Sequence, residues 1–253
     1  MKITFLGTGT SQGVPVVACQ CDVCQKGTKK DKRLRSSVLV EIEDKVFVID
    51  AGPDFRYQLL REKVTKLDGI LVTHHHKDHI GGMDDVRSFN WLTRKAVDIY
   101  ASKASQQVIM NDFMYAFDEN AYPGVPSFQL HTITNKTFNI KGVSIEPLEA
   151  LHLKMPVLGF RIDDFAYITD ANYLPQETLK KLIGCKVIVL NALRKEKHIS
   201  HFNVEEAVEI LNFLRPEKAY LTHISHLMGY HDAINKMLPD FVELAYDQLT
   251  ISI

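Results

Sequence analysis

A run of histidines directly after a short apolar stretch constrains the fold of this chain more than any other feature. The apolar residues 70–72, Ile-Leu-Val, predict a buried strand, and Thr-His-His-His-Lys-Asp-His-Ile-Gly-Gly follows them at 73–82. If the backbone stays extended at the start of this segment, His74 and His76 point to the same side, because side chains alternate along an extended chain. These two imidazoles can then share one metal ion.

The second half of the same segment supplies two more metal-binding side chains. Asp78 and His79 come where the chain turns toward the next helix, so they can face a neighbouring point and bind a second ion. Gly81 and Gly82 permit a tight turn there. The alternative interpretation is a polar surface turn, or one that binds a single adventitious ion.

Short β-rich runs alternate with helical patterns along the chain, which is typical of an α/β fold. The predicted strands include 2–6, 37–43, 45–50 and 69–72. The predicted helices are 55–63, 83–92, 103–117, 175–183 and 204–213. There is no fixed-period repeat, low-complexity tract or linker, so we expect one domain over residues 1–253. The clearest long loop is 118–129, and the sequence does not define its role.

Composition places the chain among ordinary globular proteins. With 45% hydrophobic and 24% charged residues it can bury a large core. The first residues reach glycine too early for the apolar core of a secretion signal, and no stretch reaches the apolar length that spans a bilayer. We therefore expect a cytoplasmic protein without a membrane segment. The formal net charge of -1 provides no global reason to bind nucleic acid.

Three of the four cysteines lie together in one short stretch. Cys19, Cys21 and Cys24 are unlike structural disulfide partners in a reducing compartment, and three thiolates need only one more ligand to complete a tetrahedral zinc site. We expect that ligand to be His226, in Leu-Thr-His-Ile-Ser-His at 221–226. The alternative is a loop of reactive or unliganded thiols.

Further candidate ligands each follow a predicted strand. They are His152 after 143–148, Asp170 after 165–169 and His223 after 219–222. Taken singly, each is weak support for a metal site, because a lone histidine is more often an ordinary surface or core residue. Asp50 lies in an Ile-Asp-Ala-Gly turn, where an aspartate by itself indicates a turn or a helix cap.

The motif His-x-His-x-Asp-His, with the later ligands in order, resembles that of the metallo-β-lactamase superfamily. The resemblance implies a four-layer αβ/βα sandwich with two catalytic divalent ions, zinc or manganese. It assigns His74, His76 and His152 to one ion and Asp78, His79 and His223 to the other. It further implies that Asp170 bridges the two ions and that Asp50 supports a ligand histidine.

A narrower resemblance comes from three motifs at the two ends of the chain. These are Phe-Leu-Gly-Thr-Gly-Thr-Ser-Gln-Gly-Val-Pro at 5–15, Cys-x-Cys-x-x-Cys at 19–24 and Thr-His-Ile-Ser-His at 222–226. Together they resemble the phosphoribosyl cyclic phosphodiesterases of the carbon–phosphorus lyase pathway and their relatives. This resemblance implies hydrolysis of a small cyclic phosphodiester by a hydroxide shared between the two metals. The cysteine loop would hold one structural zinc. The resemblance also suggests a homodimer, for which the composition gives no indication.

A proton donor for the leaving group is also implied by this resemblance. His201 precedes Phe-Asn-Val-Glu-Glu-Ala, a predicted helix start, and matches the general acid of the superfamily's phosphodiesterases. His198 is the competing candidate, because it lies only three residues earlier.

Two other functions remain in competition with a small-molecule phosphodiesterase. A transfer-RNA 3′-processing endonuclease would share the metals and the acid, but the near-neutral charge disfavours a large RNA substrate. A non-catalytic metal-binding or redox-sensing protein would use the cysteine loop as its working element. The number of metal-directed side chains outside that loop argues against it.

Overall fold

The computed structural model describes residues 1–118, 120 and 122–253, and two seven-stranded sheets form its centre. The first sheet runs β14-β1-β2-β3-β4-β5-β6. Its strands are β14 (Thr250–Ser252), β1 (Lys2–Gly7), β2 (Ser37–Ile42), β3 (Lys45–Ile49), β4 (Gly69–Leu71), β5 (Val97–Ala101) and β6 (Phe128–Thr132). Strands β3 to β6 are parallel, whereas β14, β1 and β2 pair antiparallel.

The second sheet repeats this plan in the second half of the chain, in the order β13-β12-β11-β10-β9-β8-β7. Its strands are β13 (Val242–Leu244), β12 (Lys218–Thr222), β11 (Val187–Asn191), β10 (Phe165–Ile168), β9 (Met155–Ile162), β8 (Val143–His152) and β7 (Phe138–Ile140). Strands β10 to β13 are parallel, and the hairpin β8–β9 pairs antiparallel beside them. Because the carboxyl ends of parallel strands meet at one edge, polar residues that follow them are brought together.

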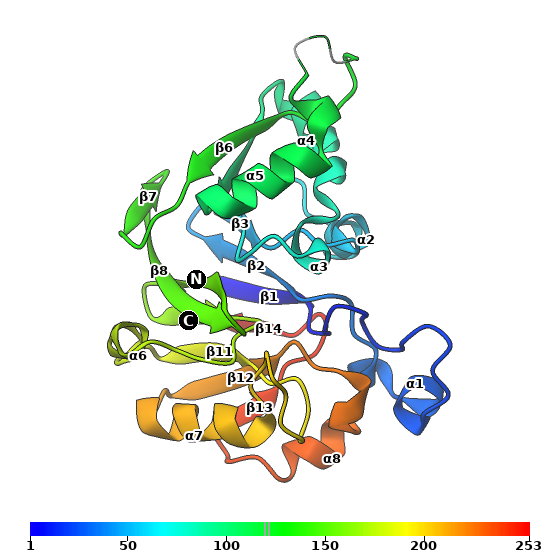
Figure 1. The fold of residues 1–253 in the computed structure, drawn as a ribbon, viewed down its shortest axis with the longest axis vertical. Coiled ribbons are helices and arrows are strands. Elements are labelled where there is room, and N and C mark those ends of the chain that lie inside the picture. The colour runs from blue at the N-terminus through cyan, green and yellow to red at the C-terminus, as the bar shows by residue number, and fades with distance from the viewer. Residues whose placement is uncertain (119, 121) are drawn as a thin grey trace.

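Helices cover the outer face of each sheet (Figure 1). On the first sheet these are α2 (Phe55–Arg61), α4 (Arg87–Thr93) and α5 (Lys103–Asp112), with the short α3 (Lys77–Ile80) at its edge. On the second they are α6 (Gln176–Leu182), α7 (Val204–Leu214) and α8 (His231–Asn235). The short α1 (Asp22–Lys26) projects from the sandwich. The predicted four-layer αβ/βα arrangement is therefore confirmed.

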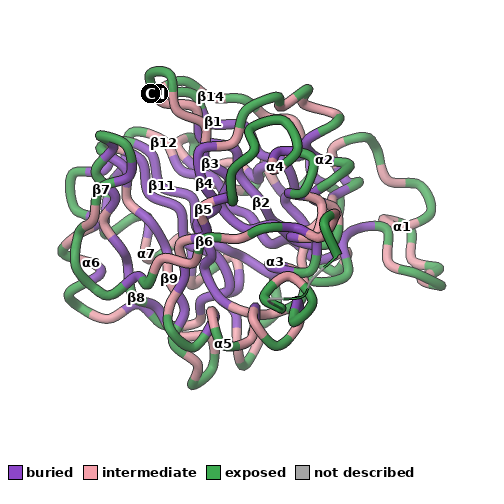
Figure 2. The backbone as a smooth tube through the Cα atoms, turned by 90° about the horizontal axis from the view of Figure 1, so that it is seen from above, coloured by how far each residue is buried: buried purple, intermediate pink, exposed green. Residues whose placement is uncertain are grey.

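Three apolar clusters hold the four layers together. One lies between the two sheets and joins residues such as Phe5 and Phe47 of the first to Phe160 and Tyr167 of the second. The other two lie between each sheet and its own helices. Figure 2 shows the consequence, because the backbone of the central strands is buried while the surrounding loops are exposed. Burial on both faces explains why several strands are continuous apolar runs.

Several predicted boundaries were wrong. The helix predicted over 103–117 ends at Asp112, because Phe113 leaves the helical conformation at φ -117°, ψ 38° and packs its ring edge-on against Phe128, with centroids 5.7 Å apart. The strand predicted over 143–148 continues to His152, which is therefore its last residue. The loop predicted over 118–129 ends earlier, since β6 begins at Phe128. Positions 119 and 121 of that loop lie outside the described residues.

The start of α7 follows its sequence signal closely. The side chain of Asn203 accepts a hydrogen bond from the backbone of Glu206, and the Glu206 side chain accepts one from the backbone of Asn203. This reciprocal capping satisfies donors that a helix start leaves free. Among the helices of the described residues, none is long and apolar enough to cross a membrane. The single domain over residues 1–253 stays a prediction.

Candidate metal centre

Polar residues stand where parallel strands end. Asp50 follows β3, Asp170 lies two residues past β10, and His223 follows β12. All three have left-handed backbone conformations, with φ of 64°, 56° and 57°. This region costs a non-glycine residue roughly 1–2 kcal/mol, and such strain persists mainly where the surroundings hold a functional group in place.

The Asp50 carboxylate sets the orientation of the histidine segment. It accepts the backbone N–H and the hydroxyl of Thr73, each over 2.8 Å, and the Nδ1–H of His79 over 2.7 Å. Because the Thr73 hydroxyl donates to Asp50, its oxygen is left to accept Nδ1–H of His74, 3.0 Å away. In their neutral forms, His74 and His79 therefore both carry the lone pair on Nε2, which is the form that binds a metal.

His74 and His76 lie together, although β4 ends at Leu71 and Thr73 lies in a bend. Their Nε2 and Nδ1 atoms are 3.1 Å apart. The next two candidates, Asp78 and His79, lie in the first turns of α3, and the Oδ2 atom of Asp78 is 3.1 Å from Nε2 of His79. The segment thus presents all four side chains to one region, as the sequence predicted.

Asp170 lies at the centre of these groups. One of its carboxylate oxygens is 3.3 Å from Nε2 of His79 and 3.5 Å from Nε2 of His74, and the other is 2.7 Å from Nδ1 of His223. Each group of three or more potential ligands at the strand ends includes Asp170. It therefore has the position expected of a residue that bridges two ions, although that role stays a prediction.

Electrostatics and hydrogen bonding fit a metal at this place. The buried Nε2 of His79 has no hydrogen-bond partner among the described residues. Burial by itself would raise the pKa of Asp170, but the imidazoles of His223 and His79 lower it well below its usual range. Burial also lowers the pKa of His74. Asp170 and Asp50 in turn raise the pKa of His79 against the effect of its burial, so a metal would replace a proton on this imidazole. Carboxylate and imidazole groups together are donors that zinc and manganese accept.

His152 and His201 complete the rim of the cluster. The Nδ1–H of His152 donates to the carbonyl of Ser200 over 2.9 Å, which leaves Nε2 free for a metal. Its ring lies 5.2 Å from that of His76 and 4.6 Å from that of His201. His152 therefore lies beside both its predicted co-ligand and the predicted acid.

The two candidates for the general acid occupy different positions. Nε2 of His201 lies 4.0 Å from the Asp170 carboxylate, and its ring is largely buried. The Nδ1 atoms of His201 and His198 both contact the Ser200 hydroxyl, at 3.1 and 3.2 Å. Only His201 among the two is paired with the metal cluster, so the geometry favours it.

A second cluster forms at the projecting loop. Sγ atoms of Cys19 and Cys21 each lie 3.3 Å from Nδ1 of His226, and Cys24 completes a group whose ligand atoms are all within 4.8 Å of one another. The backbone N–H of Cys24 and the His226 side chain lower the pKa of Cys21 to about 6, whereas burial raises that of Cys24 to about 11. The buried Cys185 lies apart from this cluster, within the second sheet's core.

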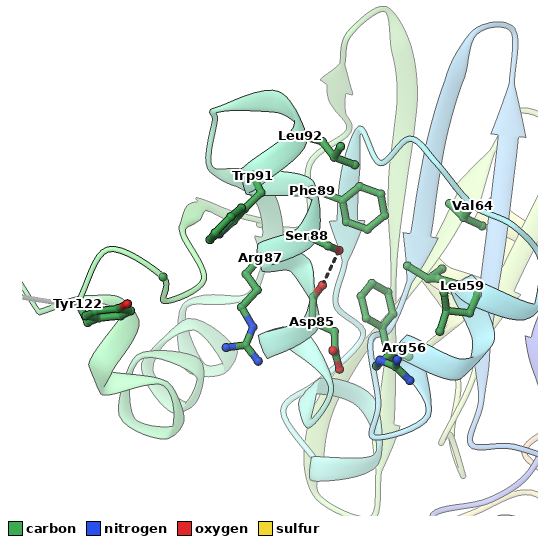
Figure 3. A pocket seen from close by; sticks show the side chains of 13 residues that line it. Arg56, Leu59, Val64, Asp85, Arg87, Ser88, Phe89, Trp91, Leu92 and Tyr122 are labelled. Carbon is green, nitrogen blue, oxygen red and sulfur yellow. Dashed lines mark hydrogen bonds between the residues drawn. The ribbon is translucent and has the colours of Figure 1, made fainter.

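A groove of about 800 Å³ lies elsewhere, between α2 and α4 (Figure 3). Apolar side chains line it, among them Leu59, Phe89 and Trp91, together with Arg56 and Arg87. None of the described residues that line it belongs to the histidine cluster. It is therefore separate from the candidate metal centre.

Comparison with known proteins agrees with this geometry. A family model described as a Beta-lactamase superfamily domain matches residues 45–224, a stretch that holds the whole histidine cluster. The chain belongs to the metallo-β-lactamase superfamily. Membership implies divalent metal cofactors, whose number and identity it does not decide.

Two curated proteins are similar in sequence to this chain, one over nearly all of it and one over about two thirds. A protein of Porphyromonas gingivalis named Octanoyltransferase is 35% identical over 252 residues, which are 98% of this chain and 51% of that protein. A Ribonuclease Z of Acaryochloris marina is 28% identical over 171 residues, which are 65% of this chain and 48% of that protein. The chain thus spans about half the length of these relatives.

A solved structure is similar to this superfamily member over nearly its full length. It is described as a new diphosphatase from the PhnP family, with 36% sequence identity and a TM-score of 0.93, covering 100% of this chain and 97% of that chain. The resemblance to phosphoribosyl cyclic phosphodiesterases, predicted from the motifs at the two ends of the chain, therefore agrees with the similarity to this PhnP-family structure.

Several residues of the site had no signal in the sequence. Thr73 is in the sequence only the first residue of the histidine segment, yet in the structure it links Asp50 to His74. Ser36 and Thr10 contact the two ring nitrogens of His223 at 3.3 and 3.2 Å, from a loop far away in sequence. Serine and threonine are common in loops, so only their tertiary contacts reveal them.

Proposed function

We propose that this chain is a phosphodiesterase that uses two divalent ions to hydrolyse a small phosphate ester, such as a phosphoribosyl cyclic phosphate. The observation that carries the proposal is the position of Asp170, whose carboxylate lies among His74, His79 and His223 and also 4.0 Å from His201. A shared metal centre and a proton donor thus meet at one carboxylate. The similarity to a diphosphatase and to Ribonuclease Z supports phosphate chemistry.

We assign the ligands as two sets that share Asp170. His74, His76 and His152 would hold one ion, and Asp78, His79 and His223 the other. When bound, such a pair supplies positive charge for phosphoryl oxygens and lowers the pKa of a water molecule. The protein's own part is to orient the imidazoles so that their lone pairs face the ions. Asp50 orients His79 by a direct hydrogen bond and His74 through the hydroxyl of Thr73.

His201 is assigned as the proton donor to the leaving oxygen. Burial lowers the pKa of His201 to about 3, with the carboxylate of Asp170 opposing the shift, so the imidazole of the free chain is neutral at pH 7. An anionic phosphate beside the ring would favour its protonated form. The Ser200 hydroxyl at Nδ1 would hold the ring so that Nε2 faces the substrate. His201 would then pass its Nε2 proton to the oxygen that leaves phosphorus.

The cysteine cluster is assigned as a structural zinc site. Cys19, Cys21, Cys24 and His226 would hold the ion, and His226 lies only three residues from the candidate catalytic ligand His223. Zinc at this point would fasten the projecting loop to the strand end that carries His223. The zinc would hold the cysteine loop in position and would take no part in the reaction.

Phosphorus NMR of the zinc- or manganese-loaded protein tests this function. A ribose cyclic phosphate, a nucleoside diphosphate derivative and a linear RNA diester would be incubated in parallel, and hydrolysis of an octanoyl thioester would be followed separately by the release of its thiol. Opening of the cyclic ester adds one water across a P–O bond and yields one monoester signal. Turnover of that ester supports the proposal, cleavage of the diphosphate alone would favour the chemistry of the similar diphosphatase, and turnover only of RNA or thioester would contradict it.

A further inference from the structure

Asn172 joins two loops on either side of the metal centre. It lies two residues past Asp170, and its side-chain oxygen accepts the backbone N–H of Leu153 over 2.6 Å. Its side-chain nitrogen donates to the backbone carbonyl of Ile199 over 3.3 Å. One amide side chain therefore uses its acceptor for one loop and its donor for the other.

Each of these loops carries a histidine of the centre. Leu153 directly follows His152 at the tip of the β8–β9 hairpin, and Ile199 lies two residues before His201. The two loops also contact each other, since His152 donates to the carbonyl of Ser200 over 2.9 Å. The distance between the two imidazoles thus depends on how the loops are held.

The backbone beside Asn172 strengthens this junction. Its own N–H donates to the carbonyl of Leu151 over 2.8 Å, and the carbonyl of Ala171 accepts the N–H of Phe202, also over 2.8 Å. The segment after Asp170 is therefore bonded to residues on both sides of His152 and just past His201. Asn172 is the member of this segment whose side chain reaches both loops.

The hairpin tip has a conformation that needs such support. Leu153 has φ 58°, in the left-handed region that favours glycine, although its side chain is half exposed and fills no core position. A non-glycine residue keeps this conformation where its surroundings hold it. The carboxamide of Asn172 binds the N–H of this strained residue.

We propose that Asn172 is a positioning residue that sets the His201 imidazole, and with it His152, at the correct distance from Asp170. This inference rests on the proposed function in one respect, the assignment of His201 as the proton donor. Catalytic groups displaced by about 1 Å can lose roughly 100-fold in rate, so the contact is expected to matter for turnover.

The test compares leaving groups that differ in their need for a proton. Bis(4-nitrophenyl) phosphate releases a stabilised phenolate, whereas a ribose cyclic phosphate releases an alkoxide that must be protonated. Assayed at saturating metal, Asn172→Ala is expected to lower kcat for the cyclic ester at least tenfold with little change in KM. The nitrophenyl ester is expected to lose less than threefold.

A second variant separates the two hydrogen bonds. Asn172→Asp keeps an acceptor for Leu153 but loses the donor to Ile199. In hydrogen exchange, Asn172→Ala should expose both the 151–155 and the 197–201 backbone, whereas Asn172→Asp should expose only the second. Asn139→Ala is the matched control, because Asn139 also accepts a hairpin N–H, that of Gly142 over 2.7 Å, at the distant β7–β8 turn.

Two outcomes would overturn the proposal. One is unchanged hydrogen exchange at both loops in Asn172→Ala, which would show that the side chain holds neither. The other is an equal loss for both esters at full metal content, which would indicate a general defect rather than a displaced proton donor. If the wild-type chain cleaves neither ester, the proposed function fails, while the exchange measurement still decides whether Asn172 holds the two loops.

Discussion

The Nδ1–H of His79 donates to the Asp50 carboxylate over 2.7 Å, and both side chains are completely buried. Through the Thr73 hydroxyl the same carboxylate also determines which nitrogen of His74 is protonated. One buried aspartate therefore prepares two imidazoles, which we assign to different ions. This arrangement makes Asp50 important to the metal centre although no ion is expected to touch it.

Replacing Asp50 by Asn should weaken metal binding. An amide must turn its NH₂ toward one of the three donors, so at least one of the contacts to Thr73 or His79 is lost. Loss of such a supporting contact typically lowers metal affinity about 10- to 100-fold. The measurement is metal content after dialysis against graded chelator. Asp98→Asn is the control, because Asp98 likewise accepts from a histidine, His131 at 2.7 Å, on the β5–β6 edge. Equal metal retention in both variants would contradict the assigned role of Asp50.

Substitution of the two candidate acids should have unequal effects. His201→Ala is expected to lower kcat for a cyclic phosphate by about 10²- to 10⁴-fold, the usual contribution of general acid catalysis. His198→Ala should change it by no more than a few fold, since His198 contacts the Ser200 hydroxyl and the ring of His201, whereas His201 itself lies 4.0 Å from the Asp170 carboxylate. Steady-state kinetics at saturating metal decides between them. The reverse order would move the proton donor to His198.

The cysteine cluster should bind zinc more weakly as the pH falls. Zinc binds the thiolate, so protons compete with the metal for the cysteines. The Cys24 N–H and His226 lower the pKa of Cys21 to about 6, so Cys21 keeps its thiolate to a lower pH than Cys24 in the metal-free chain. Zinc release can be followed with a chromogenic chelator. Cys21→Ser should contain about one zinc fewer per chain and unfold at a lower temperature, whereas Cys185→Ser should keep its zinc. Full zinc content in Cys21→Ser would refute the assignment.

A buried histidine outside the metal sites should make stability depend on pH. Burial, helped by the positive charge of Arg33, lowers the pKa of His231 to about 4. The unfolded chain takes up this proton near pH 6.5. Between about pH 6.5 and 4 the unfolded state therefore binds more protons, and the free energy of unfolding decreases as the pH decreases.

Urea unfolding of the metal-free chain across this pH range measures the effect. His231→Gln should flatten the dependence on pH. The control is His131→Gln, at a partly exposed position on the β5–β6 edge, which should leave the dependence unchanged. An equal slope in the wild-type chain and in His231→Gln would exclude His231 as its source.

Local sequence was sufficient for groups that lie within one segment. His74, His76, Asp78 and His79 are one or two positions apart, so the short segment between β4 and α3 and the start of α3 determine where they point. Asn203 likewise caps its helix through contacts three residues away. Such arrangements are predictable because covalent geometry limits them.

Contacts between segments far apart in the chain could not be predicted from the local sequence. The end of α5 at Asp112 depends on aromatic packing against Phe128 of β6, and the length of β8 depends on its pairing with β9. Helical periodicity and apolar runs carry no information about such partners. Predicted boundaries were therefore wrong at these two places. The helix predicted over 83–92 also begins as a 3-10 helix, Met83–Val86, before α4.

The spacing of imidazole, carboxylate and thiolate groups in the sequence is typical of metal sites and predicts which residues supply the donors. The folded structure was needed to see that Asp170 lies between the other candidate ligands. It was also needed to see that Thr73 connects Asp50 to His74 and that Asn172 binds two loops. Asp170 meets the histidines after β4 because the two sheets pack face to face through their apolar residues. The contacts of Thr73 and Asn172 join strand ends and loops within one sheet, and strand pairing brings these segments together. All these contacts join residues far apart in sequence, which local preferences do not determine.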